Sequence, residues 1–222
     1  MSGLPAPIVV LISGRGSNLR AIVDAVQGGQ LPVVVRAVLS NNPQAQGLAF
    51  ARAAGIPTEV IDHRNYPERA QFDQALAEAI DRYVPRLVAL AGFMRILGAE
   101  FIRHYAGRLI NVHPSLLPDF KGLNTHARAL AAGAREHGAS IHFVTNDLDG
   151  GPVIAQARVD VRPGDSAGTL AARVLEVEHR LYPLAIRWAV EDRLSIRDGR
   201  VLLDGAVRPE QGLTAGSEAN RS

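Results

Sequence analysis

Short apolar runs alternate with longer amphipathic segments along most of the chain. The runs at residues 8–12, 33–39 and 87–91 are mostly apolar, as is typical of strands buried on both faces of a sheet. We expect helices between them, at residues 17–26, 45–54 and 66–83. The last is the clearest, because Phe72, Leu76, Ile80 and Tyr83 fall at helical spacing. This alternation predicts an α/β fold with a mainly parallel sheet.

The second half of the chain continues the pattern. We expect strands at residues 58–61, 109–112, 140–144 and 153–161, and helices at residues 99–104, 125–132 and 167–190. Residues 194–196 and 201–203, joined through Asp198-Gly199, predict a C-terminal hairpin. The expected architecture is a single Rossmann-like domain over residues 1–222. It is an open twisted sheet with helices on both faces, and residues 1–6 and about 213–222 form flexible tails.

The composition is that of an ordinary globular protein with balanced charge. The 222 residues carry a formal net charge of +2, and 47% of them are hydrophobic, which is enough for one large core. The charges form no like-charged block, so we expect no nucleic-acid partner. The sequence shows no signal peptide and no apolar stretch long enough to span a bilayer. We therefore expect a cytoplasmic protein without a membrane partner.

Thiol and metal chemistry receive no support from the sequence. The chain has no cysteine, which excludes disulfides, thiolate metal ligands and a cysteine nucleophile. Among the 7 histidines, no pair has metal-ligand spacing with a supporting carboxylate. His137 and His142 are five positions apart, but they lie across an expected glycine break. We expect no metal.

A glycine-rich segment, Ser13-Gly14-Arg15-Gly16-Ser17-Asn18, joins the first predicted strand to the first predicted helix. Ligands usually bind at this edge of an open α/β sheet, and the free amides of a helix start can hold an anion. The segment lacks the third glycine of the dinucleotide fingerprint, and the second strand offers no acidic residue for an adenosine ribose. These features favour a phosphomonoester over a dinucleotide. A glycine turn without a ligand is the alternative.

An amide and an imidazole follow each other at the end of another predicted strand, in Asn111-Val112-His113-Pro114. Side chains in a strand alternate between faces, so Asn111 and His113 project in the same direction. A neutral hydrogen-bond donor beside a titratable base suits acyl transfer to an amine, where one group holds an oxyanion and the other moves protons. A pair of polar side chains that only caps a turn remains the alternative.

Two further segments carry candidate chemistry. Asp147 and Asp149 lie in a glycine-rich turn, and either one facing His113 would favour the charged form of the imidazole. The sequence does not select between them, and solvated turn carboxylates are the alternative. Residues 92–97 place apolar side chains and Arg95 after a buried strand, where they would line a flat heteroaromatic pocket or pack in the core.

In their joint order and spacing, four segments resemble the glycinamide ribonucleotide formyltransferase family, the folate-dependent enzymes of purine synthesis. The resemblance covers residues 8 to about 212. Its matching pieces are Val10-Leu11-Ile12-Ser13-Gly14 with Gly16-Ser17-Asn18, Leu90-Ala91-Gly92-Phe93-Met94-Arg95-Ile96-Leu97, Asn111-Val112-His113-Pro114-Ser115-Leu116-Leu117-Pro118 and Asp147-Leu148-Asp149-Gly150-Gly151-Pro152.

The resemblance implies a single formyltransferase domain that moves a formyl group from 10-formyltetrahydrofolate to the amine of 5'-phosphoribosylglycinamide, without a metal, as a monomer or homodimer. It implies that Asn111, His113 and Asp149 are catalytic, with Asp149 keeping His113 oriented and cationic, and that Ser140 supports His113. Substrate phosphate and ribose would contact Gly16, Ser17, Asn18 and Glu178. Folate would contact Arg69, Met94, Arg95, Ile96, Leu97 and Asn111, with the loop at about residues 145–151.

The sequence departs from the family pattern at two positions. Arg15 stands where the family often has Asn, and Asn124 stands where some relatives have His. The nearest alternative is a formyltetrahydrofolate hydrolase, which uses the same residues but gives the formyl group to water. A methionyl-tRNA formyltransferase and a non-catalytic ligand sensor on the same fold are the more distant ones.

Overall fold

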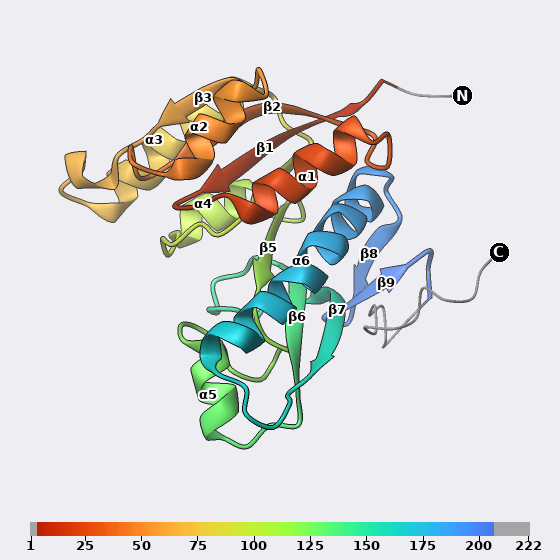
Figure 1. Cartoon of the computed structure of the whole chain (residues 1–222). Coiled ribbons are helices and arrows are strands. Elements are labelled where there is room, and N and C mark those ends of the chain that lie inside the picture. The colour runs from red at the N-terminus through yellow and green to blue at the C-terminus, as the bar shows by residue number, and fades with distance from the viewer. Residues whose placement is uncertain (1–3, 207–222) are drawn as a thin grey trace.

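The computed structural model describes residues 4–206. Most of its strands belong to one large sheet, and a second sheet is a hairpin (Figure 1). The strands are β1 (Ala6–Ile12), β2 (Val33–Ser40), β3 (Thr58–Val60), β4 (Leu87–Leu90), β5 (Leu109–His113), β6 (Glu136–Phe143), β7 (Val153–Asp160), β8 (Leu194–Arg197) and β9 (Arg200–Leu203). The helices are α1 (Ser17–Gln27), α2 (Gln46–Ala53), a 3-10 helix η1 (His63–Asn65), α3 (Arg69–Asp81), α4 (Ala99–His104), α5 (Thr125–Ala131) and α6 (Ala167–Val190).

The large sheet has a parallel part and an antiparallel part. Its seven strands lie in the order β3-β2-β1-β4-β5-β6-β7, and β8 pairs with β9 in the separate hairpin. The strands from β3 to β5 are parallel, whereas β6 is antiparallel to both β5 and β7. The predictions of a mainly parallel α/β sheet and of a C-terminal hairpin are confirmed.

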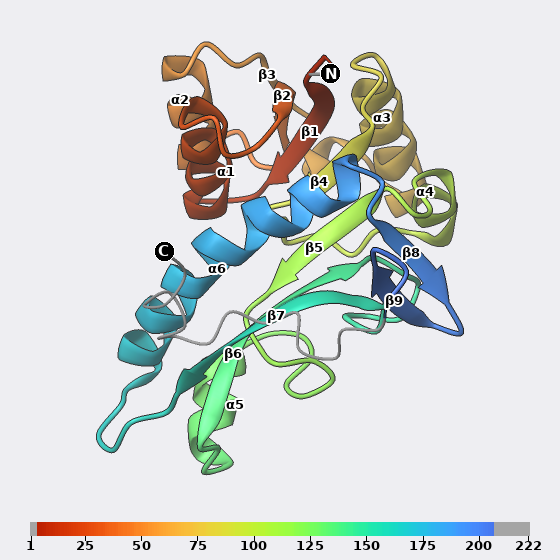
Figure 2. The same cartoon turned by 90° about the vertical axis from the view of Figure 1, so that its right-hand side faces the viewer.

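Helices cover both faces of the sheet, as the sequence predicts. Helices α1, α2 and α6 lie on one face, and α3 and α4 lie on the other (Figure 2). Alternate side chains of β1 enter the two cores: Ile8 and Val10 pack on the α1 side, while Val9 and Leu11 pack on the α3 side. All four are fully buried, which explains the continuous apolar run in this strand.

The long helix α6 packs against the sheet near the edge where the candidate residues lie. It begins at a capping box in which Ser166 and Thr169 exchange side-chain and backbone hydrogen bonds, and it continues through Pro183. The buried Tyr182 hydroxyl donates to the carbonyl oxygens of Leu90 at 2.9 Å and of Ile110 at 3.3 Å. These contacts fix α6 against the last residue of β4 and the second residue of β5.

The starts of three elements differ from the sequence prediction by two residues or more, and several other boundaries differ by one or two. The third long helix begins at Arg69 instead of residue 66, because η1 and Pro67 precede it. Strand β6 begins at Glu136 instead of residue 140, since its first half pairs with β7 although it carries few strand-forming side chains. Ala6 belongs to β1 and not to a flexible tail. The rest of the tail predictions, residues 1–3 and 213–222, lie outside the described residues.

Candidate active site

The candidate residues gather where three neighbouring strands end. Strand β4 pairs in parallel with both β1 and β5, so the carboxyl ends of these strands lie side by side. The glycine loop at residues 13–18, the segment at residues 92–97 and the segment from Asn111 onward start from this edge. In an open α/β sheet this is the position at which ligands bind.

Asn111 and His113 project from the last residues of β5 on the same side of the strand. The antiparallel strand β6 lies beside them, and it pairs Asn111 with His142 and His113 with Ser140. His113 is 5% exposed. Its Nε2 lies 3.0 Å from the carbonyl oxygen of Phe120, so the surrounding loop fixes the orientation of the ring.

Asp149 is the turn carboxylate that faces these residues. Its Oδ2 lies 3.4 Å from Nδ1 of His113, and its Oδ1 lies 3.6 Å from Nε2 of His142. The amide of Gly122 donates to Asp149 Oδ2 at 2.8 Å. Asp149 has a φ of +47°, an uncommon backbone conformation outside glycine that turns its side chain toward β5. Asp147 is exposed in the same turn.

The pKa values of His113 and Asp149 are both shifted in this cluster. Burial lowers the pKa of His113 below its ordinary value, and the Phe120 carbonyl and the Asp149 carboxylate offset only part of that shift. Burial alone would raise the pKa of Asp149, but contacts from His142 and the Gly122 amide, together with nearby His113, lower it. Both shifts favour an ionised Asp149 and disfavour a cationic His113 in the free protein, so a cationic His113 stays a prediction for the reaction itself.

His142 is a site residue that the sequence reasoning missed. It is 2% exposed, and its Nε2 lies 3.1 Å from the Asn111 side-chain nitrogen. Its Nδ1 lies 2.9 Å from the carbonyl oxygen of Phe143, so one ring nitrogen is anchored while the other faces the site. Sequence reasoning weighs His142 only as a metal ligand together with His137, rejects that pairing, and does not place His142 in the site. The signal for its position is the register between β5 and β6, which a sequence does not display.

A second group, outside the Asn111 cluster, joins the glycine loop to α6. Asn18 Nδ2 donates to Glu178 Oε2 at 2.7 Å, and both side chains are buried. Asn18 Oδ1 is also buried and has no hydrogen-bond partner among residues 4–206. Glu178 lies one helical turn before Tyr182, so α6 carries this group close to the ends of β4 and β5.

The glycine loop needs its small residues for steric reasons. Gly16 has a φ of +77°, and a Cβ atom on it would lie 2.8 Å from the Cα atom of Gly47. Ser17 is the first residue of α1, which has no acidic side chain in its first turn. The loop therefore presents the amide end of a helix of 11 residues beside the Asn18–Glu178 pair.

A pocket of about 120 Å³ lies between the segment at residues 93–97 and the turn at residues 144–149. Arg95, Ile96 and Leu97 line it together with Asn111, His142 and Asp149. Met94 is 67% exposed and does not line it. Arg69 lies apart from this pocket, in a wider groove of about 940 Å³ between α3 and α4 that holds none of the Asn111 cluster. The predicted folate set is thus only partly brought together.

Ser140 supports the loop that follows His113. Its hydroxyl donates to the carbonyl oxygen of Ser115 at 2.7 Å and accepts from the amide of Leu117 at 3.0 Å. Gln156 on β7 donates to the same hydroxyl at 3.0 Å. Ser140 therefore holds the backbone beyond His113 in place and does not contact the imidazole through any of these bonds.

The two departures from the family pattern lie at exposed positions. Arg15 is exposed in the glycine loop, and Asn124 precedes α5 with a φ of +56°. On α5, Arg128 donates to the carbonyl oxygens of Lys121 at 2.6 Å and of Leu123 at 3.4 Å. Arg128 thereby holds the loop that presents Phe120 to His113 and Gly122 to Asp149.

Neither a metal cluster nor a membrane span is found in the part of the chain that the structure describes. Within residues 4–206, no group of three or more His, Asp or Glu side chains is arranged to hold a metal ion. In the same range, no helix is long and apolar enough to cross a membrane.

Comparisons with known proteins identify the family of the chain. The class of protein is given by the sequence profile of the family described as Formyl transferase, which matches residues 6–186. Phosphoribosylglycinamide formyltransferase of Escherichia coli strain K12 is 52% identical over 208 residues, which cover 94% of this chain and 98% of that protein. The solved structure of phosphoribosylglycinamide formyltransferase from Coxiella burnetii has a TM-score of 0.89 and 51% identity, and the match covers 95% of this chain and 99% of that one.

A more distant structure bears on the hydrolase alternative. A formyltetrahydrofolate deformylase from Pseudomonas syringae is 26% identical, with a TM-score of 0.84, over 91% of this chain and 67% of that one. The high identity over nearly full length favours the phosphoribosylglycinamide formyltransferases over the deformylase. The chain belongs to the phosphoribosylglycinamide formyltransferase family and is an enzyme of purine biosynthesis.

Proposed function

We propose that this enzyme transfers the formyl group of 10-formyltetrahydrofolate directly to the primary amine of 5'-phosphoribosylglycinamide. The single observation that carries the proposal is the convergence of Asn111, His113 and Asp149 at the edge of the sheet from which two candidate binding segments also start. One segment is the glycine loop with Asn18 and Glu178, and the other is the pocket at residues 93–97. A bimolecular transfer needs both substrates to be held with their reacting atoms in contact.

The glycine loop and α6 would bind the amine substrate. The amides of Gly16, Ser17 and Asn18 at the start of α1 suit a phosphate dianion. Glu178 would accept hydrogen bonds from the ribose hydroxyls, and the unpartnered Asn18 Oδ1 offers a second acceptor. This arrangement would direct the glycinamide amine toward the end of β5.

The pocket at residues 93–97 would bind the folate. Arg95, Ile96 and Leu97 line it, and Asn111 lies at its inner end, so a bound pterin would bring its formyl carbon close to the Asn111 amide. Met94 at the rim would cover the folate from outside. Arg69 lies in the neighbouring groove and would contact the acidic end of the folate.

The transfer would proceed through a tetrahedral intermediate. The amine attacks the formyl carbon, and the oxyanion that forms is held by the Asn111 side-chain amide and by His113. The negative charge that forms beside His113 favours its cationic form: His113 takes a proton from solvent as the intermediate forms, pairs with Asp149, and returns the proton to solvent as the intermediate collapses. A water bound at Asp149 carries the amine proton to the folate nitrogen as the carbon–nitrogen bond breaks. Tetrahydrofolate and the formylated amine leave.

The hydrolase alternative uses the same three residues but needs no second substrate. The Asn18–Glu178 pair beside a phosphate-type loop is therefore the feature that favours transfer. The experiment follows the absorbance of 10-formyltetrahydrofolate in the presence of the protein, with and without 5'-phosphoribosylglycinamide. Turnover only with the amine supports the proposal, whereas equal turnover without it would establish hydrolysis.

We further propose that the enzyme works in the cytoplasm as a monomer or homodimer, with no metal and with no nucleic-acid or membrane partner. The balanced net charge of +2 supports the absence of a nucleic-acid partner. Light scattering after gel filtration measures the oligomeric state. Activity that survives dialysis against a chelator is the expected result, and its loss would contradict a metal-free reaction.

A further inference from the structure

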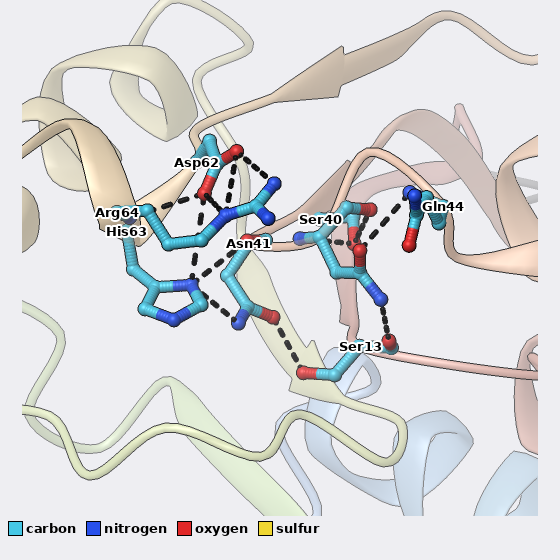
Figure 3. A network of polar contacts seen from close by, with 8 residues as sticks. Ser13, Ser40, Asn41, Gln44, Asp62, His63 and Arg64 are labelled. Atoms are coloured by element: carbon cyan, nitrogen blue, oxygen red, sulfur yellow. Dashed lines mark hydrogen bonds and ion pairs between the residues drawn. The ribbon is translucent and has the colours of Figure 1, made fainter.

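A polar network crosses the edge of the sheet where β1, β2 and β3 end (Figure 3). It joins Ser13 after β1, Ser40 to Asn42 at the end of β2, and Asp62 to Arg64 after β3. None of these residues belongs to the set proposed above to contact a substrate. The network nevertheless reaches the segment at residues 93–97 through Ser13, because β1, which Ser13 follows, is the neighbour of β4.

The Ser13 hydroxyl is the point at which this network meets the folate segment. Ser13 Oγ donates to Asn41 Oδ1 at 2.5 Å and accepts from the backbone amide of Met94 at 2.7 Å. The Ser13 backbone amide also donates to the carbonyl oxygen of Gly92 at 3.1 Å. One residue of the glycine loop therefore bonds to both ends of the turn that starts the segment at residues 93–97.

Asn41, which is itself held by His63, fixes the orientation of the Ser13 hydroxyl. His63 Nδ1 lies 3.0 Å from the carbonyl oxygen of Asn41 and 3.3 Å from its side-chain nitrogen. The His63 ring meets Phe72 edge-on with the ring centroids 6.4 Å apart, and Phe72 is a core residue of α3. Asn41 is 4% exposed. Its side-chain nitrogen faces His63, and its Oδ1 points at Ser13 (Figure 3).

Resting on the proposed function, we propose that Ser13 is a positioning residue for the folate half of the site. Its hydroxyl, oriented by Asn41, holds the Met94 amide and so sets the backbone of residues 93–97 before folate binds. The glycine loop and the folate segment then form one preorganised unit. Ser13 acts through this backbone and does not itself take part in the formyl transfer.

The chemistry of the hydroxyl explains why a serine suits this position. A hydroxyl donates one proton and accepts at its lone pairs, so it can join a carbonyl-type oxygen to an amide N–H. Alanine would remove both bonds, but the Met94 amide is at an exposed position and would be solvated instead. The loss at Met94 falls on the fixed geometry of the segment, while the buried Asn41 Oδ1 that loses its donor lowers the stability of the fold. Losing one such bond is expected to weaken folate binding by about three- to tenfold.

Ser40 offers a matched control within the same network. It is fully buried, and its hydroxyl exchanges hydrogen bonds with the backbone of Asn42 at 3.0 and 3.1 Å. Ser40→Ala therefore removes one buried hydroxyl from the network without touching the Met94 amide. A general loosening of this edge of the sheet would affect Ser40→Ala and Ser13→Ala alike.

The experiment compares the kinetics of both variants with the wild type. Ser13→Ala should raise KM for 10-formyltetrahydrofolate about three- to tenfold, with kcat and KM for the amine substrate within about twofold of wild type. Ser40→Ala should leave all three within about twofold. Equal KM for folate in Ser13→Ala and wild type, or an equal rise in Ser40→Ala, would overturn the proposal. Wild-type transfer tests the proposed function separately.

Two further measurements keep the proposal open to refutation if alanine disturbs folding. The pair Ser13→Thr and Ser13→Val has nearly the same shape and differs in one hydroxyl, so only the threonine variant should keep the wild-type KM for folate. Hydrogen exchange at the Met94 amide should be faster in Ser13→Val than in Ser13→Thr, while exchange in α1 stays unchanged. Identical exchange in both variants would show that the hydroxyl does not hold this amide.

Discussion

The side-chain nitrogen of Asn111 lies 3.1 Å from Nε2 of His142, a residue paired with it across two antiparallel strands. With the Nδ1 proton of His142 directed at the Phe143 carbonyl, Nε2 can accept a hydrogen bond from the Asn111 amide. This contact directs the remaining amide hydrogen of Asn111 toward the pocket. The antiparallel half of the sheet thus orients the group that would hold the oxyanion.

Replacing His142 should therefore reduce turnover without removing the substrate sites. We expect His142→Leu to lower kcat by about fivefold, since the loss of one orienting hydrogen bond costs about 1 kcal/mol. His142→Gln keeps an amide at similar reach and should retain more of the activity. Steady-state kinetics at saturating substrates measure the effect. Equal kcat in the two variants would argue against orientation by hydrogen bonding.

Replacing Asn111 tests the oxyanion role itself. Asn111→Ala should lower kcat by about 10²–10³, because an oxyanion donor supplies about 2.7–4 kcal/mol of transition-state stabilisation. Asn111→Asp has nearly the same shape but presents a carboxylate to the oxyanion, so it should be at least as inactive. Circular dichroism and thermal melting serve as the control for the fold. Near-normal turnover in Asn111→Ala would remove this residue from the mechanism.

The ionised Glu178 carboxylate should lower the stability of the folded protein while it favours binding of the amine substrate. Burial raises the pKa of Glu178 from 4.5 to about 6, and the Asn18 amide offsets only part of that shift. The unfolded chain releases this proton at lower pH than the folded protein, so stability falls as pH rises from about 4.5 through 6. The cost of the ionised carboxylate is then about 2 kcal/mol at neutral pH.

Glu178→Gln should accordingly raise the melting temperature at pH 7.5 by about 2–6 °C while raising KM for the amine substrate. In the wild type, KM for that substrate should rise as pH falls below about 6, and the variant should lose this limb. The exposed Glu176, on the same helix, provides the control variant Glu176→Gln. A stability gain of equal size in both variants would contradict the assignment to burial.

Alanine substitutions at Gly16 and Gly55 distinguish the cost of backbone strain from the cost of a steric contact. Both have positive φ, +77° and +73°, but only a Cβ atom on Gly16 meets a neighbour. Gly55→Ala should cost about 1 kcal/mol in urea unfolding, and Gly16→Ala about 2–4 kcal/mol because of the added contact with Gly47. Gly16→Ala should also raise KM for the amine substrate. Equal losses of stability would show that the loop relaxes around the new methyl group.

Sequence reasoning predicts the features that follow from the local spacing of apolar and polar side chains. The fully buried Ile8 and Leu11 and the spacing of Phe72 and Leu76 are sufficient to assign the buried strand and the helix to which they belong. The common side of Asn111 and His113 follows from strand alternation alone. None of these inferences depends on which distant segments meet.

The features that local sequence patterns do not supply depend on distant pairing or on unusual backbone geometry. His142 meets Asn111 through strand register, and Asp149 is selected over Asp147 by a turn with positive φ. Arg69 begins α3 and lines the groove between α3 and α4, not the pocket at residues 93–97. Apolar spacing carries no information on any of these relationships.

The bond between Asn18 and Glu178 spans 160 positions of the sequence. One half of the proposed amine-substrate site is therefore made early during synthesis on the ribosome, and the other half emerges only with the last long helix. A nascent or truncated chain that ends before α6 has the glycine loop but lacks the carboxylate that faces it. The ability to hold this substrate would then be acquired late and all at once, when the nearly complete polypeptide docks α6 against the sheet.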